Sequence, residues 1–180
     1  MSFFYELQFM KTVSKIELRP ITAEDHENIF RGLSNPEVIR YYGISFRTLE
    51  ETKEQMRWFQ DLEKNETGKW WAVYNTNTNQ FLGAGGFNDL SKQLKKAEIG
   101  FWLLPEFWGK GYMQEAMPII CEYGFKELEL ERIEGFVESK NIRCKTAIEK
   151  LDFKLERTIR DSELKNGKFI STDIYSKLKE

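Results

Sequence analysis

A strand-like run of residues, Lys96 to Leu104, leads at once into a glycine-containing turn and then into an amphipathic helix. The turn has the sequence Pro105-Glu106-Phe107-Trp108-Gly109-Lys110-Gly111-Tyr112. The first amides of a helix have no acceptor inside the helix, and the helix dipole favours negative charge at that end. Gly109 and Gly111 allow the backbone to approach a ligand closely, and Lys110 adds a positive charge. The sequence therefore predicts a phosphate or pyrophosphate site at this turn.

Two nucleotide-binding motifs that use similar turns do not fit this segment. A Rossmann motif requires a third glycine, and Ala116 comes too late in the chain to replace it. A P-loop requires Ser or Thr directly after Gly-Lys, whereas Lys110 is followed by Gly111. Glycines that merely end a loop are the simplest alternative. The wider order distinguishes this segment: strand, turn, helix, strand, and then a helix that begins at Asn141.

Length and composition indicate one domain and exclude several classes of protein. A chain of 180 residues with a hydrophobic fraction of 41% can fill one core. A net charge of −2 gives no indication of general nucleic-acid binding. No run approaches the roughly 20 apolar residues of a membrane-spanning helix. Residues 1–10 lack the basic start and the cleavage site of a signal peptide. We therefore expect a cytoplasmic protein without a membrane partner.

The cysteines suit a reducing compartment. Cys121 and Cys144 are the only two, and each falls in a helical pattern. We expect both to be buried thiols rather than a disulfide. The chain has no cluster of Cys and His residues, so no zinc or other metal site is expected.

The hydrophobic pattern predicts a mixed α/β domain whose sheet is largely antiparallel in its first half. Strands are expected at residues 16–19, 70–74, 81–87, 97–104, 132–138, 153–159 and 169–178. Helices are expected from Thr22, from Pro36, from Thr48 with Glu51 as its cap partner, after Gly111 and after Asn141. Pro118 is expected to kink the fourth helix, and Asn166-Gly167 predicts a hairpin turn. We assign residues 1–14 to an N-terminal extension and residues 15–180 to a single domain.

This order of elements, with these residues, resembles the GNAT superfamily of N-acetyltransferases. Its pyrophosphate motif, Gln/Arg-x-x-Gly-x-Gly/Ala, aligns with the segment from Trp108 to Met113 and departs from it at the first and last positions. In having tryptophan at the first motif position, the chain resembles the Rim-type branch of the superfamily. This branch comprises the ribosomal-protein N-terminal acetyltransferases and their relatives. Shared segments are Ala97-Glu98-Ile99-Gly100-Phe101-Trp102, Glu115-Ala116, Asn141-Ile142-Arg143-Cys144 and Glu149-Lys150-Leu151-Asp152-Phe153, with Asp152 and Cys144 as departures. The resemblance covers about residues 15 to 178.

The resemblance implies the GNAT fold, a mixed and mostly antiparallel central sheet flanked by helices, and acetyl-CoA as the acetyl donor. Backbone amides of one segment would hold the pyrophosphate: Trp108, Gly109, Lys110, Gly111, Tyr112 and Met113. Backbone groups of Trp102, Leu103 and Leu104 would pair with the pantetheine arm like an added strand. Asn141 would contact the cofactor near its thiol, and it would also serve as a helix N-cap.

Glu98 and Cys144 are the candidate catalytic residues. Glu98 shares a strand face with Gly100 and Trp102, and its carboxylate is suited to take a proton from the acceptor ammonium. The alternative for Glu98 is a surface or sheet-pairing role. Cys144 stands where the branch often has serine and would protonate the departing thiolate, or it is simply a core residue. Superfamily members often use a tyrosine as the general acid, at the position that Ile148 occupies here. Water and Tyr175 are therefore further candidates for the general acid.

The Rim-type resemblance implies a protein N-terminal α-amine as the acceptor. A polyamine or an aminoglycoside amine is the alternative, and a non-catalytic acyl-CoA sensor is a further one. The acceptor would enter between residues 38–47 and the last hairpin. Relatives often form dimers, so a homodimer is expected.

Overall fold

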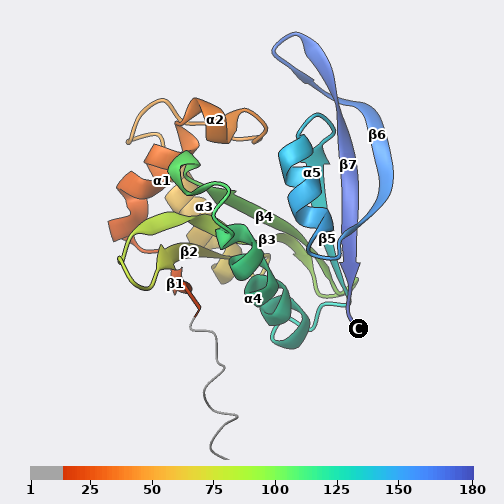
Figure 1. Ribbon diagram of the computed structural model, residues 1–180, viewed down its shortest axis with the longest axis horizontal. Helices are drawn as coiled ribbons and strands as arrows, with labels where there is room; N and C mark the ends of the chain where they lie inside the picture. The colour runs from red at the N-terminus through yellow and green to blue at the C-terminus, as the bar shows by residue number, and fades with distance from the viewer. Residues whose placement is uncertain (1–13) are drawn as a thin grey trace, which may run out of the picture.

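The computed structural model describes residues 14–180, which form one seven-stranded sheet with helices on both faces (Figure 1). The predicted N-terminal extension lies outside the described residues except for Ser14. The strand order is β1-β2-β3-β4-β5-β7-β6. The strands are β1 (Ile16–Pro20), β2 (Lys69–Asn75), β3 (Phe81–Ser91), β4 (Lys96–Leu103), β5 (Arg132–Glu138), β6 (Lys154–Lys165) and β7 (Lys168–Leu178). Every neighbouring pair is antiparallel except β4 and β5, which are parallel, so the predicted mixed, mostly antiparallel sheet is confirmed.

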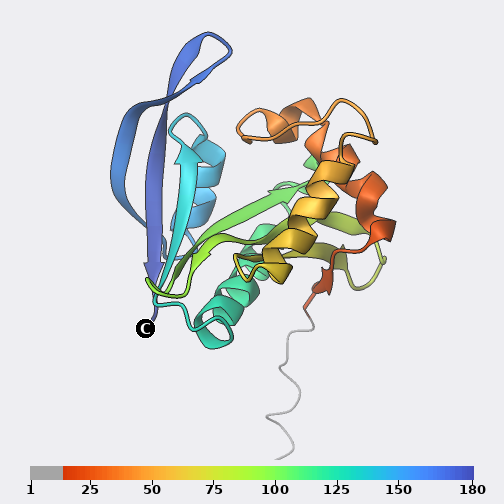
Figure 2. The same cartoon turned by 180° about the vertical axis from the view of Figure 1, so that it is seen from behind.

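Helices cover the two faces of the sheet separately. One face packs against α1 (His26–Leu33), α2 (Pro36–Ile39) and α3 (Lys53–Lys64), and Figure 2 shows α3 on this side. The other face packs against α4 (Tyr112–Lys126) and α5 (Ile142–Glu149), which face the viewer in Figure 1. Two short 3₁₀ helices, η1 (Ala23–Asp25) and η2 (Pro105–Phe107), precede α1 and α4. The apolar residues thus form one core on each side of the sheet.

Helix α4 runs without a break across Pro118 for 15 residues. Proline removes one backbone hydrogen bond, to the carbonyl of Gln114, but its fixed φ is compatible with helix geometry. Met117 and Ile120, on either side of the proline, are buried against the sheet and hold this part of the helix in place. Tertiary packing therefore offsets the lost hydrogen bond.

The third predicted helix begins later than the sequence suggested. Thr48 and Glu51 do make the contacts of a cap: the Glu51 amide donates to Thr48 Oγ1 at 3.2 Å, and the Arg47 amide donates to Glu51 Oε2 at 2.8 Å. These contacts close a turn, however, and the α-helix starts only at Lys53. The prediction that Thr48 and Glu51 cap this helix was wrong, because a side chain can stabilise an isolated turn with the same hydrogen bonds.

The last two strands form a long hairpin whose turn is at Asn166-Gly167, as predicted. Both residues have positive φ, 49° and 74°, which is the conformation of a tight type I′ turn. Almost every residue of β6 is exposed, and β6 is the edge strand of the sheet. The hairpin extends past the end of α5 in Figure 1.

Within residues 14–180, every helix falls short of the length and apolarity of a membrane-crossing segment. In the same residues, no three His, Cys, Asp or Glu side chains gather closely enough to hold a metal ion.

Candidate active site

The glycine-containing turn adopts a backbone conformation that glycine adopts more easily than any other residue. Gly109 has a φ of 72° and Gly111 a φ of 83°, both in the left-handed region. Apart from chain neighbours, no atom of residues 14–180 lies within 4 Å of where a Cβ atom would stand at either glycine. The space beside both glycines is therefore open, and a ligand can approach the backbone closely there.

The first amides of α4 are free to bind a ligand. Gly111 is the N-cap of this helix, and the Glu115 amide donates to the Gly111 carbonyl at 3.2 Å. The amides of Tyr112, Met113 and Gln114 precede that bond and have no acceptor inside the helix. The side chains of Tyr112 and Met113 pack against buried apolar residues. Met113, one of the departures from the family motif, thus leaves its amide available.

Trp108 is held firmly in the turn before α4. Its indole Nε1 donates to the Leu103 carbonyl at 2.9 Å, and its ring packs against buried apolar residues. The Arg143 guanidinium of α5 lies over the same ring, with Cζ 4.9 Å from the ring centre. This contact joins the turn before α4 to the first turn of α5. Sequence reasoning did not identify Arg143, since the two residues are far apart in the chain.

Strands β4 and β5 separate beyond Glu98. Their parallel pairing comprises three residue pairs, and the last joins Glu98 to Glu134. From Ile99 to Leu103, β4 pairs on one side with β3 and has no partner on its other edge among residues 14–180. Unpaired backbone groups at a strand edge can accept an extended chain of amides as if it were another strand. The predicted residues Trp102 and Leu103 lie on this open edge and Leu104 follows them, all with buried side chains. The Leu104 amide donates to the Leu82 carbonyl at 2.8 Å and is therefore already paired on the β3 side.

Glu98 lies on the sheet face that carries α1–α3, beside this separation. Its cross-strand neighbours are Asn88 on β3 and Glu134 on β5. Burial, the negative charge of Asp89 with its hydrogen bond, and the negative charge of Glu134 together raise the pKa of Glu98 to about 7. A hydrogen bond from Asn88 acts in the opposite direction. A carboxylate with this pKa takes up and releases protons near neutral pH, which suits a general base.

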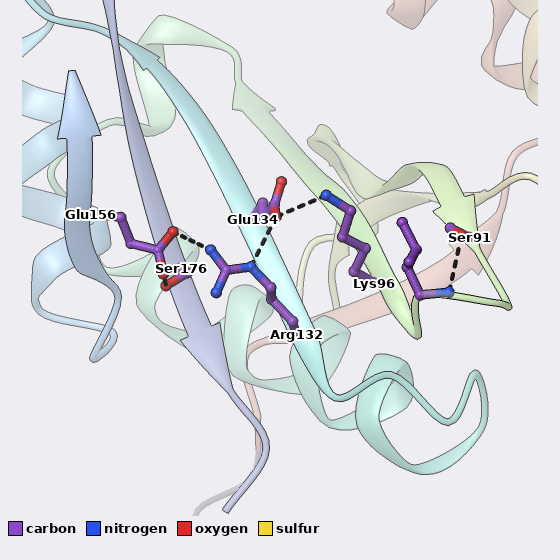
Figure 3. Close-up of polar contacts among 7 residues, drawn as sticks. Ser91, Lys96, Arg132, Glu134, Glu156 and Ser176 are labelled. Carbon is purple, nitrogen blue, oxygen red and sulfur yellow. Dashed lines mark hydrogen bonds and ion pairs between the residues drawn. The ribbon is translucent and has the colours of Figure 1, made fainter. Parts of the chain in front are cut away.

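A network of charges fixes the closed end of the β4–β5 pair (Figure 3). Glu134 Oε1 accepts from Lys96 Nζ at 3.1 Å and from Arg132 Nε at 2.8 Å. Arg132 also pairs with Glu156 of β6, which accepts from the Ser176 hydroxyl at 2.8 Å. Burial alone would raise the pKa of Glu134, but the bonds from Arg132 and Lys96 lower it. Glu134 therefore stays ionised next to Glu98.

We expect Glu134→Gln to lower the pKa of Glu98. The substitution removes a negative charge that disfavours ionisation of Glu98. Because the base acts in its ionised form, the rising limb of kcat/KM against pH should shift to lower pH. Glu156→Gln is the matched control, since Glu156 belongs to the same network and does not contribute to the pKa of Glu98. An equal shift in both variants, or none in Glu134→Gln, would contradict this coupling.

Tyr42 reaches the same face of the sheet from the segment after α2. Its hydroxyl lies 3.7 Å from where a Cβ atom would stand at Gly100, two residues beyond Glu98. The pKa of Tyr42 is raised by burial and by the negative charge of Glu98. The phenol therefore stays protonated and able to donate a hydrogen bond. Tyr42 falls in the predicted acceptor segment, residues 38–47, but no sequence motif singled it out.

Gly100→Ala should lower the thermal stability of the protein markedly. A Cβ atom at this position would lie 2.6 Å from the ring of Trp70, which is buried and cannot move away. Overpacking of this kind typically costs about 1–3 kcal/mol. Thermal unfolding monitored by circular dichroism tests this. Adding Trp70→Phe should restore part of the loss by making room, and failure of that rescue would place the strain elsewhere.

Asn141 and Cys144 occupy the first turn of α5. Asn141 Oδ1 accepts from the Cys144 amide at 3.2 Å, so the predicted N-cap is confirmed. Cys121 is buried as expected, whereas Cys144 is only half-buried. Burial raises the pKa of the Cys144 thiol to about 11, so the thiol is protonated at neutral pH. The expectation that both thiols are buried was wrong, because Cys144 lies in the first turn of α5, where its neighbours Ile142 and Arg143 are exposed.

Tyr175 is fully buried on β7, on the sheet face opposite Glu98. Its hydroxyl donates to Glu149 Oε1 at 2.8 Å, and burial together with this carboxylate raises its pKa. The hydroxyl is thus already bonded within the chain. This arrangement favours a packing role over a catalytic one.

Two surface hollows lie away from these residues. One, of about 540 Å³, is lined by charged residues such as Glu63, Lys69 and Glu127. The other, of about 320 Å³, lies beside α1 and α3. Neither contains a residue of the glycine turn or Glu98, so the candidate site rests on the strand opening and not on either of these hollows.

Comparisons with known proteins agree with this geometry. The family model described as "Acetyltransferase (GNAT) domain" matches residues 15–154. The chain is 32% identical over 166 residues to the uncharacterized N-acetyltransferase YoaA of Bacillus subtilis, covering 92% of this chain and 94% of that protein.

Solved structures of similar fold include the Vibrio cholerae spermidine N-acetyltransferase with CoA and spermine, at a TM-score of 0.83 and 19% identity over 92% of this chain and 96% of that one. The ribosomal L7/L12 α-N-protein acetyltransferase RimL, with CoA, has a TM-score of 0.82 and 18% identity over 92% of this chain and 94% of that one. The sheet with its separated parallel pair, the glycine turn and these matches lead to one assignment. The chain belongs to the GNAT family of N-acetyltransferases, whose cosubstrate is acetyl-CoA.

Proposed function

We propose that this chain acetylates a protein N-terminal α-amine, with Glu98 as the general base. One observation carries the proposal: a carboxyl group with a pKa of about 7 lies where β4 and β5 separate. The acceptor ammonium must lose a proton before its nitrogen can attack a carbonyl carbon. Above neutral pH, Glu98 is ionised and able to accept that proton, either directly or through a water molecule.

The chain's own groups fit the cofactor of the family. The amides from Gly109 to Met113 would hold the pyrophosphate, and the open edge of β4 at Trp102 and Leu103 would pair with the pantetheine amides. Two of the predicted amides are already used within the chain, since the Trp108 amide donates to the Pro105 carbonyl at 3.1 Å and the Leu104 amide to the Leu82 carbonyl at 2.8 Å. The Asn141 side chain uses its oxygen in the helix cap, so its NH₂ group is the part left for the cofactor. Acetyl-CoA supplies the acetyl group as an activated thioester.

We propose Cys144 as the proton donor to the leaving thiolate. Its thiol is protonated at neutral pH and only half-buried, and it lies in the same helical turn as Asn141. Where superfamily members often have a tyrosine, this chain has Ile148, which cannot donate a proton. Cys144 is the nearest alternative donor on α5. Cys144→Ser should keep most activity, because a hydroxyl also donates, whereas Cys144→Ala should lower kcat by about tenfold. Equal rates for both variants would leave solvent water as the acid.

The pKa of the base favours an α-amine over an alkyl amine. An α-amino group has a pKa of about 8, and a lysine-type alkyl amine has one of about 10.4. Transfer of a proton to a base of pKa about 7 is therefore about 3 kcal/mol easier from the α-amine. The residues shared with the Rim-type branch point to the same acceptor, and RimL itself is named as an enzyme of this kind.

A polyamine is the second candidate acceptor. Glu98, Asp89 and Glu134 form a group of negative charges on one face, which would attract a polycation. One structural relative is a spermidine acetyltransferase. Lys96 and Arg132 neutralise Glu134, however, so the net field near Glu98 is weaker than the count of carboxylates suggests.

A thiol-release assay with acetyl-CoA tests the acceptor directly. N-terminal peptides, spermidine and an aminoglycoside would be compared at equal concentration and pH. The proposal expects the highest kcat/KM with peptides that have a free α-amine, and none with the same peptides blocked at the N-terminus. A higher value with spermidine would replace the N-terminal amine with the second candidate.

We also propose a cytoplasmic location, from the composition, and a homodimer. The exposed edge strand β6 supports the dimer, since it carries large apolar side chains at Leu155, Ile159 and Leu164. An exposed apolar edge of this length is a surface that a second chain can cover. Size-exclusion chromatography with light scattering distinguishes a dimer from a monomer. Charged substitutions at Leu155 and Ile159 should convert the dimer to a monomer if β6 forms the interface.

A further inference from the structure

Two cations flank the open backbone of the glycine turn, and they come from different parts of the chain. Lys110 belongs to the turn itself, and its Nζ lies 5.7 Å from the centre of the Phe107 ring. Arg143 comes from the first turn of α5 and lies over Trp108. Both side chains therefore rest on aromatic rings that border the turn. Gly109 and Gly111 lie in the same short segment, and within residues 14–180 only chain neighbours come within 4 Å of where their Cβ atoms would stand.

The charge of Arg143 is not neutralised by any carboxylate of the described residues, 14–180. Among residues 14–180, Arg143 forms no ion pair with a carboxylate, and no hydrogen bond within this part of the chain uses its guanidinium. The residue is exposed, so a ligand can reach its guanidinium, which carries five N–H donors. A guanidinium that is stacked on a ring keeps its edge free for a planar, two-pronged bond to a phosphate. Stacking also reduces the side-chain freedom that would be lost when a ligand binds.

We infer that Arg143, positioned by Trp108, binds a phosphate group of acetyl-CoA. The amides of the turn and of α4 would hold the cofactor from one side of the strand opening, and Arg143 would bind it from the side of α5. The assignment rests on the family's cofactor and is independent of which amine is acetylated. It adds a side-chain contact to a site that the sequence motif describes through backbone amides alone.

Isothermal titration calorimetry with Arg143→Gln tests this assignment. We expect the Kd for CoA to rise about fivefold to tenfold, because one charge-assisted pair is lost. Pantetheine, which has no phosphate, should compete equally well in both proteins. An unchanged Kd for CoA, or an equal loss for pantetheine, would overturn the assignment. Titration with 3′-dephospho-CoA identifies which phosphate Arg143 binds. If Arg143→Gln also weakens binding of 3′-dephospho-CoA, the arginine binds the pyrophosphate. If it weakens binding of CoA alone, the arginine binds the 3′-phosphate.

Two further variants separate charge from position. Arg160→Gln removes an exposed arginine of β6 that has no ion pair in residues 14–180, so it should leave the Kd for CoA unchanged and controls for net charge. Trp108→Leu removes the ring on which Arg143 lies but keeps the backbone amide. In that background Arg143→Gln should cost less than twofold, since the guanidinium is no longer positioned. Full additivity of the two substitutions would overturn the positioning role of Trp108.

Discussion

Glu98→Gln should reduce kcat by about 100-fold to 1000-fold at pH 7.5, the range expected for loss of a general base. The amide has nearly the same size and can still form hydrogen bonds, so packing on β4 should persist. The Kd for acetyl-CoA should stay within about twofold, because the glycine turn and the open strand edge bind the cofactor without this side chain. Thermal stability should not fall, since burial already disfavours the ionised carboxylate.

The pH dependence makes this prediction specific to a base. In the wild type, kcat/KM should rise with pH through the pKa of Glu98, near 7. The variant should lack this limb and gain activity only as the acceptor amine loses its own proton in solution. The ratio of wild-type to variant rates should therefore fall as the pH approaches the pKa of the amine. A ratio that is independent of pH would show that Glu98 acts by charge or position and does not accept the proton.

Local chemistry made much of this site predictable from the sequence. The two glycines, the lysine between them and the helix that follows are neighbours in the chain, so the open turn and the free helix amides that they form need no long-range information. The hairpin turn at Asn166-Gly167 is likewise set by the positive φ values that these two residues adopt. The choice of Glu98 depended on a longer pattern, the resemblance to a known family.

Contacts between distant segments were not predictable. The pKa of Glu98 depends on Asp89 and Glu134, which reach it through the pairing of β4 with β3 and β5. The sequence indicated these strands but not their register, and a shift of one residue would turn Glu134 to the other face. The stacking of Arg143 on Trp108 has the same origin, since it requires α5 to lie beside the turn before α4. Register and helix placement follow from packing of the whole core.

Gly111→Glu should weaken acetyl-CoA binding by at least about 100-fold, equivalent to ~2.7 kcal/mol. The new side chain would enter the open space that we assign to the pyrophosphate and place a negative charge against it. A non-glycine residue at a φ of 83° is also strained, by about 1–2 kcal/mol, which would shift the N-cap of α4 and its free amides. Calorimetry with CoA measures the combined loss. Retained binding would mean that the pyrophosphate lies elsewhere.

The hairpin offers a matched control for the strain. Gly167 has a φ of 74° and, like Gly111, has nothing within 4 Å of its Cβ position, but it lies at the tip of the β6–β7 hairpin. Gly167→Glu should lower the unfolding temperature to a similar degree and leave the Kd for CoA unchanged.

Gly111→Asn separates the effect of charge from the effect of backbone conformation, because asparagine tolerates the left-handed region and carries no charge. If its Kd rises only about threefold, repulsion of the phosphate accounts for most of the loss in Gly111→Glu. If Asn and Glu weaken binding equally, the conformation of the turn is what the cofactor requires, and the glycine serves geometry more than space.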